Sequence, residues 1–378
     1  MPQDPTATSD VAVIGGGIIG LAVAWRAAQR GLTVCVLERG ELGAGTSHVA
    51  AGMLAPVTEA DPGELALLEL GLRSARAWPA FARELSDAAG VDAGVRASGA
   101  LVVARDGDAA LALERELALR LHLGLEVRRL LPSAARRLEP ALAPTVRLAL
   151  EVRGDHCVDP RAVVLALAQA ARGAGVTLRT GSAVERAEQR GGRVTGVGLA
   201  GGELVRARHV VVAAGVWSGA IEGLPRIALR PVKGQILRLR DPAGPGLLER
   251  IVRFEGGYLV PRGDGRYVLG ATMEERGFDT TVTAGGLYEL LRDAAELVPG
   301  VHELVIEEMS AGLRPATPDN APLLGPAAGL KGLHWATGHH RNGILLAPVS
   351  AELVVDGIDI GAQVPAAFAA GRFAEVHA

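Results

Sequence analysis

The feature that most constrains the fold is an apolar strand, a glycine-rich turn and a helix that follow one another within residues 11–30. Residues 11–14 predict a buried strand, residues 18–30 predict a helix, and residues 33–37 predict a second apolar strand that ends at Glu38. A strand–helix–strand unit in this order is typical of a parallel sheet whose strands are connected by helices. We therefore expect an α/β fold built on a Rossmann-type domain.

The turn after the first strand has the glycine spacing of a dinucleotide-binding motif, G-x-G-x-x-G, at Gly15, Gly17 and Gly20. The first glycine permits the tight turn, the second lets the backbone approach a pyrophosphate, and the third lets the helix pack closely on the strand. The helix N-terminus offers free N–H groups to phosphates. Glu38 is placed to accept hydrogen bonds from ribose hydroxyls and disfavours a 2′-phosphate, so the unit predicts FAD or NAD rather than NADP.

A long loop of small residues, 41–56, favours FAD over NAD. A doubly wound NAD enzyme would continue here with a helix and another strand. Small side chains instead let the backbone reach a flat ring with polar edges, along which residues 51–53 can lie, while Thr46 and Ser47 can bind a pyrophosphate or ribityl chain. A surface loop is the alternative, but the apolar half, AAGMLAP, argues against full exposure.

The rest of the chain predicts a return to the nucleotide-binding domain after a long excursion. Residues 209–212 form an apolar strand that runs into Ala213, Ala214 and Gly215, a small-residue exit that faces the cofactor again. Amphipathic strands between 229 and 269 predict a second, antiparallel sheet. We expect an FAD-binding domain made of residues 1–85, 152–224 and 305–378, and a substrate domain made of residues 86–151 and 225–304.

The composition excludes several classes of function. The 378 residues carry a formal net charge of −3 without a basic run, so nucleic acid is not an expected partner. The apolar run near the first strand is too short and too rich in glycine to span a bilayer, so no membrane attachment is expected. The two cysteines, Cys35 and Cys157, give no disulfide framework, which favours a reducing, cytoplasmic compartment. No further ligands are spaced around His339 and His340 to make a metal site.

Six segments in order resemble the D-amino-acid-oxidase family of FAD-dependent flavoproteins: IGGGIIG, AAGMLAP, AAGVWS, ATM, GLRP and GHHRNGILLAP. Within that family the sequence is most similar to the glycine oxidases of thiamine biosynthesis, over residues 10–357. The resemblance implies oxidative deamination of glycine, or of small amines such as sarcosine or D-alanine, to glyoxylate or another 2-oxo acid, ammonia and H2O2. It also implies a β-sheet-rich lid domain over a non-covalent FAD, an amino acid and O2 as partners, and a homotetramer.

The resemblance also assigns residues to the two ligands. Those that would contact FAD, besides the glycines of the first turn, are Ile18, Ile19, Glu38, Arg39, Thr46, Ser47, Ala51, Gly52, Met53, Val184, His339, His340, Arg341, Asn342, Gly343, Ile344 and Leu345. Those that would lie at the substrate are Arg314, Tyr258, Arg341 and Met273.

The residue chemistry agrees with these substrate assignments. A guanidinium is a planar two-donor partner for a carboxylate, and Pro315 restricts the backbone of Arg314 to an extended conformation. Tyr258 can donate its hydroxyl to the same carboxylate; a surface arginine and a core tyrosine are the alternatives. A helix expected from Asn342 would direct its dipole at the flavin. Hydride transfer from a neutral amine needs no protein base, so none is assigned.

Some roles stay open in the sequence. Lys233 is either a surface strand lysine or a group that takes part in oxygen activation. His48 either packs in its loop or links covalently to the flavin, whereas a cysteine link of the sarcosine-oxidase type is excluded because no cysteine follows Cys157. A quinone-linked D-amino-acid dehydrogenase, a sarcosine or D-amino-acid oxidase, and a flavin-binding subunit without turnover are the alternative functions.

Overall fold

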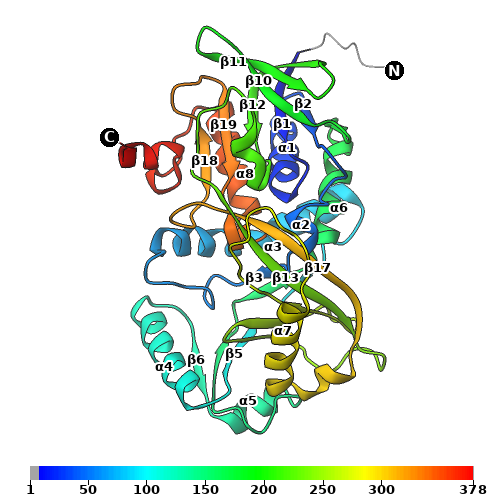
Figure 1. Ribbon diagram of the computed structural model, residues 1–378, viewed down its shortest axis with the longest axis vertical. Coiled ribbons are helices and arrows are strands. Elements are labelled where there is room, and N and C mark those ends of the chain that lie inside the picture. Colours follow the sequence, from blue (N-terminus) through cyan, green and yellow to red (C-terminus); the bar gives the residue numbers. More distant parts are fainter. Residues whose placement is uncertain (1–7, 378) are drawn as a thin grey trace.

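The computed structural model describes residues 8–377, and its two large sheets occupy opposite halves of an elongated molecule (Figure 1). In the first sheet β9, β2, β1, β12 and β19 are parallel neighbours, β18 adds to β19 antiparallel, and β10 and β11 form a meander with the first half of β12. The strands of this sheet are β1 (Ser9–Ile14), β2 (Val34–Leu37), β9 (Thr177–Arg179), β10 (Val184–Arg190), β11 (Arg193–Leu199), β12 (Leu204–Val212), β18 (Leu323–Pro326) and β19 (Leu333–Thr337).

The second sheet is antiparallel except where β14 runs parallel to β5, and its order is β17-β13-β16-β15-β14-β5-β7-β6. Its strands are β5 (Ala100–Ala104), β6 (Arg128–Leu130), β7 (Leu148–Val152), β13 (Arg230–Arg240), β14 (Ile251–Phe254), β15 (Gly257–Pro261), β16 (Arg266–Gly270) and β17 (Val305–Ala316). A small third sheet joins β3 (Met53–Leu54), β8 (His156–Val158) and β4 (Val95–Arg96). The expected fold class, a Rossmann-type domain with a second, mainly antiparallel domain, is confirmed.

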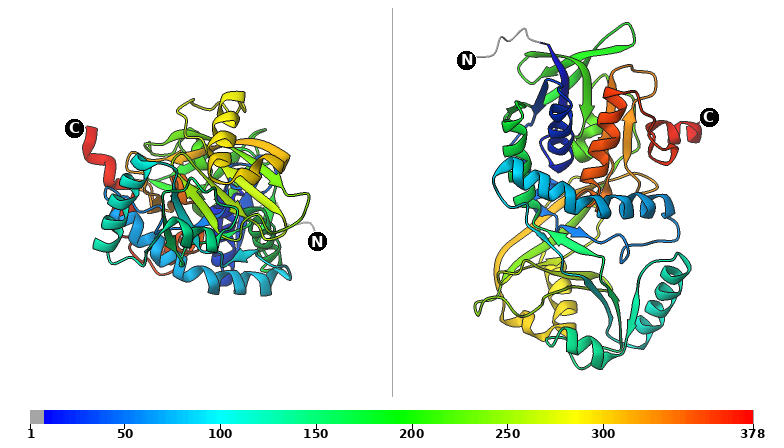
Figure 2. Two further views of the ribbon diagram at one scale, coloured as in Figure 1. Left: turned by 90° about the horizontal axis from the view of Figure 1, so that it is seen from below. Right: turned by 180° about the vertical axis from the view of Figure 1, so that it is seen from behind.

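Helices cover these sheets and connect them. They are α1 (Ile18–Gln29), α2 (Thr46–Val49), α3 (Leu65–Ala89), α4 (Gly107–His122), α5 (Pro132–Leu138), α6 (Pro160–Gly173), α7 (Ala284–Leu297) and α8 (Ala347–Asp359), with short 3-10 turns η1 (Gly215–Ala220), η2 (Pro299–Glu303), η3 (His340–Asn342), η4 (Ala366–Phe368) and η5 (Ala370–His377). The long helix α3 lies across the middle of the molecule, between the two halves (Figure 2). The second sheet packs against α5 and α7 on one side and against α4 on the other.

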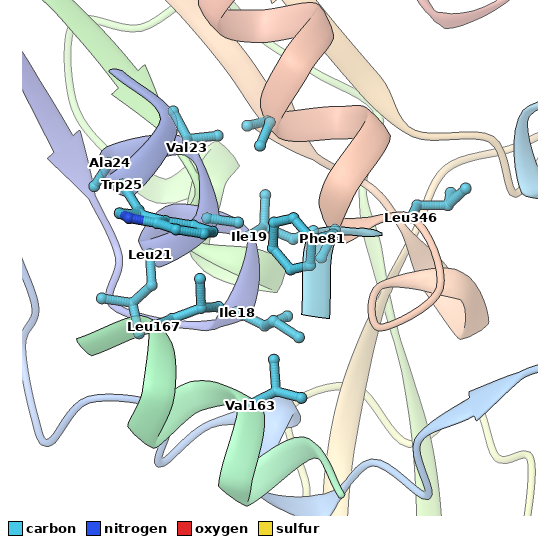
Figure 3. Close-up of a cluster of buried hydrophobic side chains, with 14 of the residues drawn as sticks. Ile18, Ile19, Leu21, Val23, Ala24, Trp25, Phe81, Val163, Leu167 and Leu346 are labelled. Atoms are coloured by element: carbon cyan, nitrogen blue, oxygen red, sulfur yellow. The ribbon is translucent and has the colours of Figure 1, made fainter. Parts of the chain in front are cut away.

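The main core lies between the first sheet and α1, α3, α6 and α8. Alternate residues of β1 face it, and Phe81 of α3 packs near Trp25 of α1, with 5.6 Å between ring centroids (Figure 3). Phe81 also packs against Trp78 in a T-shaped arrangement, at 5.3 Å between centroids. The other residues of β1 face a second core with β10, β11 and β12. Both faces of the parallel strands β1 and β2 are buried, so the sequence of each of these two strands contains a continuous run of apolar residues.

Two sequence-based boundaries differ from the structure. Residues 305–316, expected in the FAD-binding domain, form β17, which pairs with β13 along its length in the second sheet. We therefore propose that the domain boundary lies after residue 316. The helix expected from Asn342 is also wrong in its start: residues 340–342 form η3, and α8 begins at Ala347.

Candidate FAD and substrate site

A cavity of about 800 Å³ lies where the two halves meet, and both large sheets line it. The first sheet contributes the turn after β1, the end of β2 and the exit of β12. The second sheet contributes β13, β15 and β17, and η3 closes one side. Ligands of open α/β sheets bind beyond the carboxyl ends of the strands, which is the position of this cavity.

The turn after β1 can only be made by glycine. Gly15 has φ +105°, and a Cβ on it would lie 2.5 Å from the carbonyl oxygen of Ala213. A Cβ on Gly20 would lie 1.9 Å from the carbonyl oxygen of Gly15, so the close packing of α1 on β1 expected from the sequence is confirmed. Gly17 lies at the N-terminus of α1 and lines the cavity. A pyrophosphate can therefore approach this backbone closely.

Acidic and aromatic groups surround the far end of this turn. The Glu38 carboxylate, at the end of β2, accepts hydrogen bonds from the N–H groups of Gly16 at 2.6 Å and Gly40 at 2.9 Å. The Arg39 guanidinium lies 3.7 Å from the centre of the Trp217 ring in a cation–π contact. Glu38, Arg39 and Trp217 all line the cavity. Trp217 lies in the AAGVWS segment, whose sequence alone assigned it no role.

The small-residue loop after β2 follows the cavity wall. It contains one short helix, α2, which the sequence did not predict. The Ser47 hydroxyl accepts a hydrogen bond from the Ile18 N–H at 3.1 Å, and the Thr46 hydroxyl donates to the Leu313 carbonyl at 2.6 Å. These two bonds tie the loop to α1 of the first domain and to β17 of the second.

Most residues that the sequence analysis assigned to the site line this one cavity. They are Gly15, Gly17, Ile18, Ile19, Glu38, Arg39, Thr46, Ser47, Ala51, Gly52, Met53, Val184, Gly215, Tyr258, Arg314, His339, His340, Arg341, Asn342, Gly343, Ile344 and Leu345. Residues that line it without having been assigned include Glu59, Trp217, Gly234 and Thr280.

Four residues considered in the sequence do not line the cavity. Gly20 lies behind the turn. Met273 is 60% exposed, and its expected place beside the substrate stays a prediction. The His48 ring lies outside the cavity, 3.8 Å from Glu308, which is not a position for a flavin link. Lys233 is buried rather than on the surface, and its ammonium pairs with Asp279 at 2.9 Å.

The substrate end of the cavity is built around Arg314 of β17. Its guanidinium lies over Gly234 of the neighbouring strand β13, where a Cβ would come within 2.3 Å of Nη2. Nη1 donates to the carbonyls of Lys233 at 3.3 Å and Thr272 at 3.1 Å. Gly234 therefore leaves room for the guanidinium, and two backbone carbonyls fix its direction.

Tyr258 lies beside this arginine. Burial raises the pKa of the Tyr258 phenol, although the neighbouring Arg314 guanidinium acts in the opposite direction. The phenol therefore stays protonated and can donate a hydrogen bond at neutral pH. Both residues line the cavity, so Arg314 is not simply a surface arginine, while Tyr258 also packs against a cluster of buried apolar residues.

His339, which precedes η3, and His340, its first residue, are both neutral. Burial lowers the pKa of His339 to about 3, and its Nε2 lies 2.9 Å from the Ser350 hydroxyl. Burial, together with the Arg341 and Arg314 guanidinium groups, lowers the pKa of His340 to about 3. His340 also has a φ of +46°, which is uncommon outside glycine. Among residues 8–377, no group of three His, Cys, Asp or Glu side chains could hold a metal ion.

Arg341 faces two acids. Its Nε lies 3.6 Å from a carboxylate oxygen of Glu59, and its Nη2 lies 3.5 Å from one of Glu64. Glu59 also lies 3.7 Å from Nη1 of Arg253. No sequence motif marks Glu59, because it belongs to an irregular segment and its partners are distant in the chain.

The whole-chain comparison decides the family. Residues 10–357 match the model of the DAO family, described as FAD dependent oxidoreductase. The chain belongs to this family. The site fits the cofactor: the turn tolerates no Cβ at Gly15, a carboxylate ends β2, and the cavity continues from there to Arg314. The family description names FAD, which agrees with the choice of FAD over NAD made from the sequence.

Named relatives cover nearly the whole chain. Glycine oxidase of Geobacillus kaustophilus is 36% identical over 93% of this chain and 93% of its own length, and its crystal structure superposes with a TM-score of 0.90 over 97% of this chain and 99% of that chain. The structure of iminodiacetate oxidase from Chelativorans sp. BNC1 is 30% identical, with a TM-score of 0.86 over 95% of this chain and 98% of that chain.

A second kind of relative is longer. The bifunctional protein ThiO/ThiG of Trichormus variabilis is 37% identical over 93% of this chain but only 53% of its own length. The chain thus spans about half the length of these relatives. Within residues 8–377, none of the helices combines the length and the apolar character needed to cross a membrane.

Proposed function

We propose that this protein is an amino-acid oxidase that converts glycine, and small amines such as sarcosine or D-alanine, to glyoxylate or another 2-oxo acid, ammonia and H2O2. The observation that carries the proposal is the position of Arg314 in the cavity. Two backbone carbonyls hold its guanidinium over Gly234, beside the protonated phenol of Tyr258. The likeness to glycine oxidase of Geobacillus kaustophilus supports this assignment.

The residues of this chain bind and orient the substrate. Arg314 offers two parallel N–H donors to the substrate carboxylate, and Tyr258 adds an O–H donor. Fixing the carboxylate fixes the neighbouring carbon–hydrogen bond, and such positioning alone lowers a barrier substantially. The residues along the first turn and η3 would hold FAD, which would supply the hydride acceptor and the route of two electrons to O2.

The residues around η3 take no proton in this scheme. His339 and His340 are neutral and stay so across the physiological range, because the pKa of each is lowered to about 3. The substrate amine has to be neutral before its carbon loses hydride, and the ammonium form of the free amino acid loses its proton to solvent without a protein base. The chain therefore supplies geometry and charge, and we assign no general acid or base.

Three further statements belong to this proposal. The likeness to ThiO/ThiG proteins supports a place in thiamine biosynthesis. The cysteines support a cytoplasmic location, because both are free and buried and burial raises the pKa of each thiol. A homotetramer is expected from the family resemblance.

A substrate panel tests the function directly. The purified, FAD-loaded protein is expected to release H2O2 with glycine, sarcosine, D-alanine or D-proline. Absence of H2O2 with all four would contradict the proposal, and flavin bleaching by these substrates without H2O2 would indicate a dehydrogenase instead.

Two variants test the carboxylate site. Arg314→Ala is expected to raise KM about 100-fold, because a pair of charged hydrogen bonds contributes about 3 kcal/mol. Gly234→Ala keeps the guanidinium but displaces it, and is expected to raise KM in the same direction while the protein retains FAD. Gly285→Ala is the control, since a Cβ there meets nothing within 4 Å. An unchanged KM in both variants would show that the carboxylate binds elsewhere.

A further inference from the structure

The charges that line the cavity divide between its two ends. Among the described lining residues the charged side chains are Glu38, Arg39, Glu59, Arg314 and Arg341. Glu38 and Arg39 lie at the dinucleotide end, where they follow β2. The wall of the substrate end therefore holds two arginines and one acid. Behind the wall, Glu64 beside Arg341 and Arg253 beside Glu59 add one charge of each sign. The net charge of +1 matches a single carboxylate.

The two arginines differ in their surroundings. Among the described residues Arg314 forms no ion pair with a carboxylate; its guanidinium bonds to two backbone carbonyls and to the Tyr258 phenol. Arg341 lies 3.6 Å from Glu59 and 3.5 Å from Glu64. At these distances the acids neutralise its charge but do not form hydrogen bonds with it. In the described part of the chain its buried Nε has no hydrogen-bond partner. Arg341 is thus neutralised, yet still has a donor to offer.

Glu59 is held in this position by buried groups on both sides of its segment. The Asp155 carboxylate accepts hydrogen bonds from the N–H groups of Val57 at 3.2 Å and Thr58 at 2.7 Å. From the second domain, Arg120 of α4 donates to the carbonyls of the same two residues, at 2.8 Å and 2.9 Å. Both Asp155 and Arg120 are fully buried, so moving Glu59 away would break bonds that water cannot replace.

We propose that Glu59 is a specificity-determining residue that excludes substrates with a second carboxylate. This inference rests on the proposed function and names the substrate class of the same site. Glycine and sarcosine bring one carboxylate, which Arg314 binds. An N-carboxymethyl amino acid such as iminodiacetate brings a second one, for which Arg341 is the remaining cation at this end. Glu59 already neutralises the charge of Arg341 and repels a second substrate carboxylate. That carboxylate would then lack a positively charged partner, which weakens binding.

Replacing the acid by its amide reverses this balance. Glu59→Gln leaves a net charge of +2 at the substrate end, matched to a dicarboxylate, and leaves Arg341 with Glu64 as its acidic neighbour. The ratio of kcat/KM for iminodiacetate to kcat/KM for sarcosine is expected to rise at least tenfold. Sarcosine is the matched substrate because it carries a neutral methyl group on the same nitrogen.

Two further variants complete the design. Glu64→Gln removes the other acid beside Arg341. Because Glu64 does not line the main cavity, this variant is expected to shift the kcat/KM ratio in the same direction by only about threefold. Glu114→Gln removes a comparable acid from an ion pair with Arg129 on the surface of α4, and is expected to leave the ratio unchanged.

Binding gives a readout that needs no turnover. Diglycolate and methoxyacetate are the oxygen analogues of iminodiacetate and sarcosine and cannot be deaminated. Titrations followed by the visible flavin spectrum should show the ratio of their dissociation constants shifting toward diglycolate in Glu59→Gln by the same tenfold. If Glu59→Gln does not retain FAD, the Glu64→Gln titration shows whether removing an acid beside Arg341 shifts the ratio of dissociation constants toward diglycolate.

The outcomes separate the two proposals. If no amino acid yields H2O2 from the wild-type protein, the proposed function is wrong. The two titrations still test whether Glu59 excludes ligands with a second carboxylate. If glycine is oxidised but the dicarboxylate ratio stays unchanged in both glutamate variants, the role of Glu59 is wrong and the function stands.

Discussion

The Asp155 carboxylate is fully buried and accepts two hydrogen bonds from backbone N–H groups. Burial has the larger effect on its pKa. Burial raises the pKa of Asp155 from 3.8 to about 6, with Glu59 acting in the same direction and the hydrogen bonds from Thr58 and Val57 opposing it. Between these two values the folded protein holds a proton that the unfolded chain releases. The contribution of Asp155 to the free energy of unfolding is therefore full below about pH 4 and falls as the pH rises through about 6.

We expect Asp155→Asn to remove this pH dependence. The free energy of unfolding of the wild type, minus that of the variant, should fall by about 3 kcal/mol between pH 4 and pH 7, since each pKa unit corresponds to about 1.4 kcal/mol. Urea unfolding at steps of half a pH unit measures the difference curve. A curve that is flat, or that rises with pH, would contradict the raised pKa.

At this scale the sequence identified residues whose own chemistry points to a role. The glycine spacing after the first strand and the Arg-Pro pair at 314–315 are local patterns, and both lie in the cavity wall. Gly234 and Glu59 were missed because their roles depend on a neighbour that is distant in the chain. Gly234 matters through the guanidinium of Arg314 on the next strand, and Glu59 through Arg341.

Among the secondary-structure elements, α3 secures the turn between η3 and α8. The carbonyl of Leu345 accepts hydrogen bonds from the Ser74 hydroxyl at 2.6 Å and the Trp78 indole at 2.8 Å. Residues 342–345 of this turn line the cavity. Helix α3 thus supports the wall of the cofactor site through two hydrogen bonds to one carbonyl.

Trp78→Phe is expected to lower FAD affinity as well as stability. Loss of the indole donor and of some volume should cost about 1–3 kcal/mol in the free energy of unfolding, and the loosened turn should raise the FAD dissociation constant several-fold. Trp25→Phe is the control, because Trp25 is equally buried and packs on the same Phe81. Equal FAD affinity in the two variants would show that the Trp78 hydrogen bond does not support the turn.

The start of α8 shows why element boundaries were harder to predict than elements. The apolar run after Asn342 has a helical pattern, but Pro348 has no N–H to bond the Ile344 carbonyl, so it fits only the first turn of a helix. The carbonyl of Leu345 is taken by α3 instead. In the same way, β17 belongs to the second sheet through its pairing with β13, a contact between segments far apart in the chain.

For the whole molecule, the cavity lies between two halves that each have a separately packed core. The main core and the core under the second sheet share no residues, whereas the cavity takes its walls from both sheets. A ligand that fills the cavity contacts both halves at once. Its binding energy therefore adds to the stability of the folded molecule, because the unfolded chain offers no such site.

We expect FAD to raise the melting temperature of the deflavinated protein in a concentration-dependent way. Free FAD at 100 times its dissociation constant should add about 2.7 kcal/mol, equivalent to several degrees in Tm. At the same FAD concentration Glu38→Ala should show a smaller rise, because it removes the carboxylate at the end of β2, whereas Glu41→Ala, an exposed acid outside the cavity, should match the wild type. Thermal scans over a series of FAD concentrations measure the shift. A Tm independent of FAD would mean that the cavity is not the cofactor site, and equal shifts in both variants would remove Glu38 from it.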